Sequence, residues 1–105
     1  MTPIRFVLVG AGNVGTHLGQ ALVAAGHTAT GVWSRVSTKA EVLAAQLGTN
    51  TISNLEHIPA ADLIVLAVQD DAVPSVAAQL PPGDAVVVHT SGSVPMEVLA
   101  HRAAR

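Results

Sequence analysis

Cysteine and tyrosine are absent from the 105-residue chain, which contains one tryptophan and one phenylalanine. The absence of cysteine excludes disulfide bonds, thiolate catalysis and cysteine-ligated zinc, and it is compatible with a reducing, cytoplasmic environment. The five histidines show no metal-ligand spacing, so we expect no metal site. Because aromatic residues are so few, the core has to consist mainly of Ala, Val and Leu, which favours layered α/β structure.

Charged side chains are scarce as well. They make up 11% of the chain, the formal net charge is -2, and Lys and Arg form no block. Nucleic-acid binding depends on neutralising phosphates, so we expect no nucleic-acid partner. No apolar run approaches the roughly 20 residues that span a bilayer, and no signal-peptide pattern begins the chain, so we expect no membrane association. A length of 105 residues allows one domain with its own core.

Short β-branched runs alternate with segments of helical spacing along the whole chain. We expect strands at residues 4–9, 28–34, 63–68 and 85–89, with a short further strand at 50–53. Helices are expected at residues 14–25, 38–47, 73–80 and 95–105, the second of them opened by Thr38 and Glu41 at capping-box spacing. This alternation predicts a doubly wound, mostly parallel α/β sheet with helices on both faces. In such a sheet, ligands bind beyond the carboxyl ends of the strands.

Three glycines, Gly10, Gly12 and Gly15, form G-x-G-x-x-G between the first expected strand and the first expected helix. Gly10 would allow a tight turn, Gly12 would let a pyrophosphate approach the backbone, and Gly15 would let the helix pack against the strand. The free N–H groups at the start of the helix favour an anion. Glycines can also serve only as turn residues, but the strand–turn–helix context favours a phosphate-bearing ligand.

The second expected strand ends in the sequence WSRVSTK. Sites for NAD usually place a carboxylate here to hold the ribose 2′-hydroxyl, whereas an Arg accommodates the 2′-phosphate of NADP. No carboxylate precedes this point, which instead offers hydroxyls and cations from Ser34, Arg35, Ser37, Thr38 and Lys39. The sequence therefore predicts NADP, with Arg35 making bidentate contacts to the phosphate. The alternative is that Arg35 is a solvated loop residue and that Ser37 or Thr38 only caps the next helix.

Four stretches, IRFVLVGAGNVGTHLGQALVAAGH, WSR, ADLIVLAVQDDAV and VVVHTSGSVPMEVL, resemble the N-terminal NADP-binding domain of the 6-phosphogluconate-dehydrogenase-like superfamily. The resemblance extends to pyrroline-5-carboxylate-reductase-like and F420-dependent NADP oxidoreductase-like proteins, and to uncharacterised bacterial Rossmann-like proteins. It implies that residues 1–105 are a Rossmann-like NADP-binding domain, the N-terminal part of a longer two-domain protein. In those families a helical C-terminal domain completes the substrate pocket and often forms a homodimer.

The resemblance also implies roles for individual residues. The residues at the pyrophosphate would be Gly10, Asn13 and Val14, and those at the 2′-phosphate Ser34 and Arg35. The residues that line the riboses would be Ala67, Val68 and Gln69. His89 and Ser91 follow the last expected strand on the side of the nicotinamide and are the candidates for catalysis. A lone histidine at a strand end also fits a hydrogen-bonded structural role.

The sequence therefore predicts the NADP-binding domain of an oxidoreductase that acts on a small C–O or C–N substrate, with the hydride chemistry belonging to the cofactor. The alternative from another class is a non-catalytic dinucleotide-binding module that senses NADP(H) or serves as an interaction domain. A third interpretation, an S-adenosylmethionine-dependent methyltransferase, shares the glycine loop. It fits less well, because such enzymes also usually carry an acidic residue after the second strand.

Overall fold

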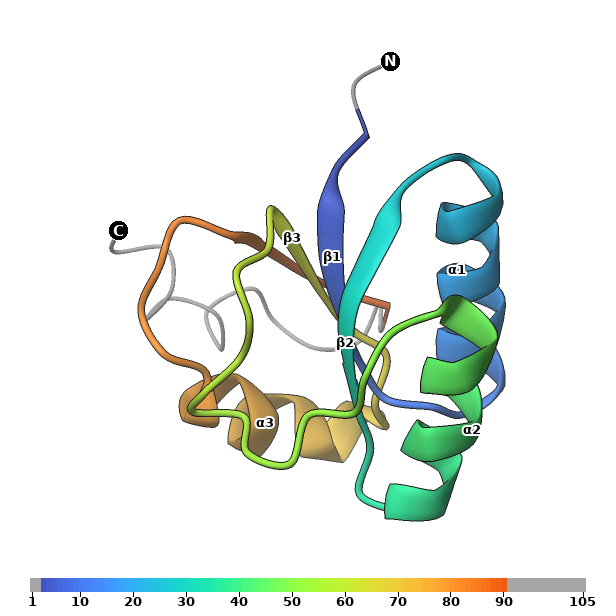
Figure 1. The fold of residues 1–105 in the computed structure, drawn as a ribbon. Helices are drawn as coiled ribbons and strands as arrows, with labels where there is room; N and C mark the ends of the chain where they lie inside the picture. Colours follow the sequence, from blue (N-terminus) through green and yellow to red (C-terminus); the bar gives the residue numbers. More distant parts are fainter. Residues whose placement is uncertain (1–2, 91–105) are drawn as a thin grey trace.

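The computed structural model describes residues 3–90. Its elements, in chain order, are β1 (Arg5–Val9), α1 (Asn13–Ala24), β2 (Thr28–Trp33), α2 (Ser37–Leu47), β3 (Leu63–Leu66), the 3₁₀ turn η1 (Asp70–Ala72), α3 (Val73–Gln79) and β4 (Val86–His89). The strands pair in parallel in the order β2-β1-β3-β4 (Figure 1). Within this part of the chain, no helix is long and apolar enough to cross a bilayer.

Both faces of the sheet carry helices, as predicted. Alternate residues of β1 point to opposite sides: Phe6 and Leu8 belong to the core beneath α1 and α2, whereas Val7 and Val9 belong to the core beneath α3. Figure 1 shows α1 and α2 together on one side of the sheet and α3 on the other. A strand buried on both faces needs apolar residues throughout, which explains why RFVLV shows so little alternation.

The expected strand at residues 50–53 is wrong. Thr51 forms only an isolated parallel bridge with Val32, held by hydrogen bonds from the Val32 N–H to the Asn50 carbonyl (3.1 Å) and from the Ile52 N–H to the Val32 carbonyl (2.7 Å). The chain then turns, because the Asn54 side chain accepts a hydrogen bond from the Glu56 N–H (2.9 Å). The described sheet therefore has four strands rather than five.

The start of α2 also differs from the expectation. Val36, not Thr38, is the N-cap residue, and no side chain caps the helix. The Ser34 hydroxyl accepts a hydrogen bond from the Val36 N–H (3.2 Å), and this local turn starts the helix earlier than the capping-box spacing suggested. The helix expected at residues 95–105 lies outside the described residues.

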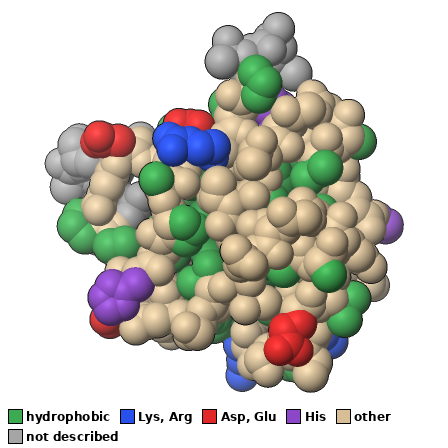
Figure 2. Space-filling model, viewed as in Figure 1, with side chains coloured by type: hydrophobic (Ala, Val, Ile, Leu, Met, Phe, Trp, Pro, Cys, Tyr) green, Lys and Arg blue, Asp and Glu red, His purple; other side chains and the backbone are tan. Residues whose placement is uncertain are grey.

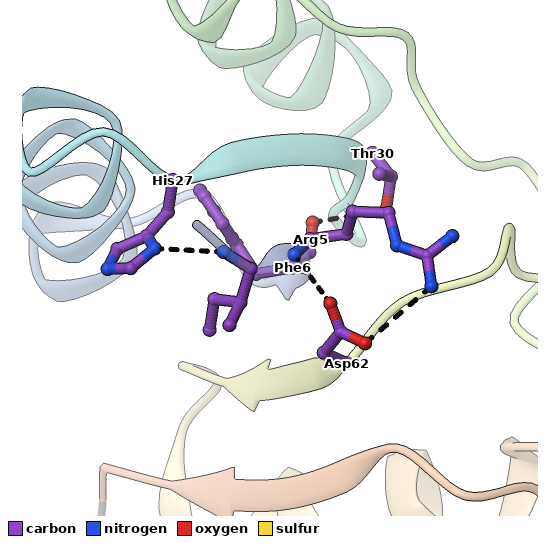
Figure 3. A network of polar contacts seen from close by, with 6 residues as sticks. Arg5, Phe6, His27, Thr30 and Asp62 are labelled. Carbon is purple, nitrogen blue, oxygen red and sulfur yellow. Dashed lines mark hydrogen bonds and ion pairs between the residues drawn. The ribbon is translucent and has the colours of Figure 1, made fainter. Parts of the chain in front are cut away.

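A polar network joins the amino ends of the strands, at the edge opposite the glycine loop (Figure 3). The Arg5 N–H donates to Asp62 Oδ2 (2.9 Å), and the Asp62 N–H donates to the Arg5 carbonyl (2.8 Å). The Arg5 guanidinium lies 3.6 Å from Asp62 Oδ1. The backbone hydrogen bond from Arg5, more than the ion pair, holds the pKa of Asp62 below its ordinary value of 3.8.

Candidate functional site

Two backbone hydrogen bonds bring the carboxyl ends of three strands together. The Gly10 N–H donates to the Trp33 carbonyl (2.6 Å), which ties the end of β1 to the end of β2. The Ala67 N–H donates to the Val9 carbonyl (2.7 Å), which ties the residues after β3 to β1. The chain crosses from one side of β1 to the other at this point, because β2 and β3 flank β1. Ligands of open α/β sheets bind at such a switch in strand order.

Gly10 and Gly15 are required by close packing around this switch. Gly10 has φ 116°, and a Cβ there would overlap the Ala67 carbonyl oxygen. A Cβ at Gly15 would overlap the Gly10 carbonyl oxygen and lie 3.3 Å from the Ala67 Cβ. These two glycines therefore allow α1 and the residues after β3 to approach the end of β1, in agreement with the sequence interpretation of Gly15.

Gly12 has a different environment. A Cβ at Gly12 would meet nothing within 4 Å, so the protein itself does not require a glycine there. Gly12 is the N-cap residue of α1, and its carbonyl accepts the first helical hydrogen bond from the Thr16 N–H (2.9 Å). No side chain caps α1 and its first turn holds no acidic residue. The first amide groups of the helix therefore face an open space that suits an anion.

A cavity of about 500 Å³ lies at this edge of the sheet. Its lining includes seven residues expected from the sequence: Gly10, Gly12, Ser34, Arg35, Ala67, Val68 and Gln69. The structure thus brings together three segments that follow three different strands. Four further residues line it: Ala11, Val36 and Ala72, which were not expected at the site, and Lys39, which belongs to the expected cluster of cations and hydroxyls after β2.

The other expected residues lie around this cavity rather than in it. Asn13 lines an adjoining cavity together with Gly12, and Ser37 lines another together with Arg35. Val14 is 55% exposed at the start of α1. The candidates for catalysis are farther away: His89 ends β4 and lines none of these cavities. Ser91 lies outside the described residues.

Positive charge is concentrated at the cavity. Between residues 3 and 90 the Lys and Arg residues are Arg5, Arg35 and Lys39, and two of these three line the cavity. Figure 2 shows Lys and Arg side chains near the upper edge, beside carboxylates, and at the lower end, where Figure 1 places the turn from β2 into α2. In the described part of the chain the one ion pair is that of Arg5, so Arg35 and Lys39 remain available to an anion.

Lys39 lines the cavity, although the sequence interpretation placed it in the cluster of cations and hydroxyls without assigning it to the site. It is the third residue of α2, whereas Arg35 precedes Val36, the N-cap residue of that helix. The available signal was the closeness of the two cations in the sequence, but whether both reach one cavity depended on where α2 begins.

The lining of the cavity contains amide groups, hydroxyls, cations and apolar side chains, but no carboxylate and no histidine. Such a set can hold and orient an anionic ligand, but it offers no group that readily exchanges a proton near neutral pH. Glu41, the first carboxylate after β2, lines the adjoining cavity instead. The arrangement therefore has the groups that suit a phosphorylated molecule.

Residues 5–92 match the family described as NADP oxidoreductase, coenzyme F420-dependent. The chain belongs to this family. The match confirms the resemblance to the NADP-binding Rossmann domains of this superfamily and excludes the methyltransferase interpretation. Among curated proteins, none matches the chain.

Solved structures with the same fold come from related oxidoreductases. A protein of Bacteroides fragilis assigned as an NADP oxidoreductase is 33% identical, with a TM-score of 0.83 over 91% of this chain. An imine reductase from a Pseudomonas species is 27% identical, with a TM-score of 0.77 over 98% of this chain. A reductive aminase from Aspergillus terreus, in complex with NADPH and ethyl levulinate, has a TM-score of 0.77 over 96% of this chain, and its 22% identity shows the fold alone.

The chain is much shorter than these relatives. It covers 39% of the Bacteroides fragilis protein and 38% of each of the other two. The part that matches is the Rossmann-type nucleotide-binding fold, so the comparisons concern the cofactor side of these enzymes.

Proposed function

We propose that the cavity at the carboxyl edge of the sheet binds NADP(H), and that this domain is the cofactor-binding part of an oxidoreductase acting on a small C–O or C–N substrate. The observation that carries the proposal is that one cavity receives the start of α1, which no side chain caps, and two cations, Arg35 and Lys39, which form no ion pair within residues 3–90. A dinucleotide with three phosphate groups matches both features.

The pyrophosphate fits the glycine loop. Gly12 is open on the side where a Cβ would project, so a phosphate can approach the backbone there without displacing protein atoms. The first N–H groups of α1 can donate to the phosphate oxygens, and the helix dipole favours the negative charge. Asn13, the first residue of α1, lines the neighbouring cavity and can add its side-chain amide.

The 2′-phosphate fits the loop between β2 and α2. Ser34, Arg35 and Lys39 line the main cavity, and Ser37 lines the cavity next to it. A guanidinium can donate two parallel hydrogen bonds to a phosphate, which gives it more specificity than an ammonium group. Without a carboxylate in the lining, the site lacks the group that usually holds the free 2′-hydroxyl of NAD.

Bound NADPH supplies the hydride, while this chain supplies binding and orientation. Because the lining holds no carboxylate and no histidine, the groups that hold the substrate and deliver a proton would come from outside this cavity. The Pseudomonas relative is an imine reductase, which supports a C=N or C=O substrate. The same lack of acid–base groups makes a non-catalytic NADP(H) sensor the second candidate function.

Titration calorimetry with NADPH and NADH tests the proposal. We expect NADPH to bind about 10 to 100 times more tightly, because the 2′-phosphate gains charge-assisted hydrogen bonds. Trp33 gives an independent signal, since it is the only tryptophan of the chain, ends β2 and lines two cavities beside Arg35. Equal affinities, a preference for NADH, or no change in Trp33 fluorescence on adding NADPH would contradict the proposal.

A further inference from the structure

His89 is the last residue of β4 and lies beside Leu66, the last residue of β3. The next residue continues this pairing, because the Thr90 N–H donates to the Leu66 carbonyl (3.2 Å). The residues that follow Leu66 are Ala67, Val68 and Gln69, which line the proposed cofactor cavity. His89 therefore lies at the same edge of the sheet, one strand beyond the cavity wall.

The ring of His89 is unusual in its hydrogen bonding. Both Nδ1 and Nε2 are buried, and neither has a hydrogen-bond partner within residues 3–90. A neutral imidazole always carries one donor and one acceptor, and leaving both unsatisfied away from water costs stability. Buried polar atoms in native proteins nearly always have partners, so these two nitrogens are suited to a ligand that supplies both a donor and an acceptor.

The order of the strands indicates which group this is. Along the edge the order is β2, β1, β3, β4, with neighbouring strands about 4.8 Å apart. In the proposed site the 2′-phosphate lies after β2 and the pyrophosphate lies after β1. The nicotinamide half of the dinucleotide is on the other side of the pyrophosphate from the adenosine half, so it extends toward β3 and β4.

We propose that His89 orients the nicotinamide half of bound NADP(H) by hydrogen bonding to it. This inference rests on the proposed function. The nicotinamide carboxamide has both a donor and an acceptor, which match the two nitrogens of a neutral imidazole. Because the ring nitrogens are buried, the contact requires rotation of the side chain between staggered rotamers toward the carboxyl edge. Pairing with the cofactor replaces an arrangement in which both nitrogens lack partners.

Substitution of His89→Phe tests this, because Phe keeps the volume of the ring and removes both polar atoms. A structural histidine would lower the thermal midpoint when replaced. For a cofactor-orienting histidine we expect a midpoint at or above that of the wild type, since the unsatisfied nitrogens are gone. Affinity for NADPH should fall about tenfold. Affinity for adenosine 2′,5′-bisphosphate, which lacks the nicotinamide half, should stay within about twofold. His57→Phe, an exposed histidine in a loop, is the matched control.

Nuclear magnetic resonance of the wild-type chain gives a readout that does not depend on a variant. The ring ¹⁵N signals of His89 should shift on adding NADPH and stay in place on adding adenosine 2′,5′-bisphosphate. Unchanged signals with NADPH, or a His89→Phe variant that binds NADPH like the wild type, would overturn the inference. If the wild type binds neither ligand, the proposed function itself fails. If it binds both and His89 does not respond, only the role of His89 fails.

Discussion

Gly10 and Ala67 are in direct backbone contact: a Cβ placed on Gly10 would lie 2.7 Å from the Ala67 carbonyl carbon. This contact joins the glycine loop after β1 to the residues after β3, which are 57 positions further along the chain. It closes one wall of the cavity, because both residues line it. The glycines of the motif therefore divide into two kinds: Gly10 and Gly15 are needed for close packing, whereas Gly12 faces open space.

This division predicts opposite phenotypes for two glycine variants. Gly10→Ala should lower the free energy of unfolding by about 2–4 kcal/mol, because φ 116° is strained for alanine and the new Cβ overlaps Ala67. Gly12→Val should cost less than about 1 kcal/mol, the usual range for a change of N-cap residue, but weaken NADPH binding at least about 100-fold. Urea unfolding and calorimetry measure the two effects. Normal NADPH binding by a folded Gly12→Val variant would contradict the placement of the pyrophosphate.

The two cations of the cavity should act selectively on the 2′-phosphate. Arg35→Ala should weaken NADPH binding about 10 to 100-fold, because it removes a bidentate charge-assisted contact. Lys39→Ala should weaken it about threefold to tenfold, since an exposed ammonium contributes less. NADH binding should change by less than about twofold in both variants. Arg5→Ala, which removes the cation at the opposite edge, is the control. Equal losses for NADPH and NADH would instead place these side chains at the pyrophosphate.

Asp62 should make stability depend on pH. Its folded-state pKa lies below the unfolded value of 3.8, so the stabilisation is present above that value and is lost as pH falls through the folded pKa. Asp62→Asn should therefore lower the thermal midpoint at pH 7, and the difference from the wild type should shrink at acid pH. Circular dichroism at pH 7 and pH 3 measures it. Asp84→Asn, which changes another exposed carboxylate at the same edge, is the matched control.

Gly31 should be coupled to Ile52 across the segment that follows α2. A Cβ at Gly31 would lie 2.5 Å from the Ile52 Cδ1 and 3.3 Å from the Pro59 Cγ. Gly31→Ala should cost about 1–3 kcal/mol through overpacking, and Ile52→Val about 0.5–1.5 kcal/mol through lost burial. Because Ile52→Val removes Cδ1, the double variant should cost at least about 0.5 kcal/mol less than the sum. Additive costs in denaturant unfolding would show that the two sites do not touch.

Several elements could be predicted because their signals are local. The β-branched run before Gly10 indicated β1, and the helical spacing that follows it indicated α1, with ends within two residues of those observed. The fold class followed from the alternation of strands and helices, and the family match confirms it. The strand expected at residues 50–53 is only an isolated bridge. The two β-branched residues there, Thr51 and Ile52, do not determine how many residues pair with the neighbouring strand.

What the sequence determined by itself was the set of chemical groups: glycines after the first strand, hydroxyls and an Arg after the second, and no carboxylate between them. These depend only on residue type and spacing. The tertiary structure alone decided which of these groups share a cavity, since Gly12, Arg35 and Gln69 meet only through parallel pairing of β1, β2 and β3. It also decided that Gly10 packs against Ala67 while Gly12 faces open space, and that both nitrogens of His89 are buried. Contacts between segments that are distant in the sequence depend on how the sheet and helices pack. No local sequence pattern determines how close such segments come in space.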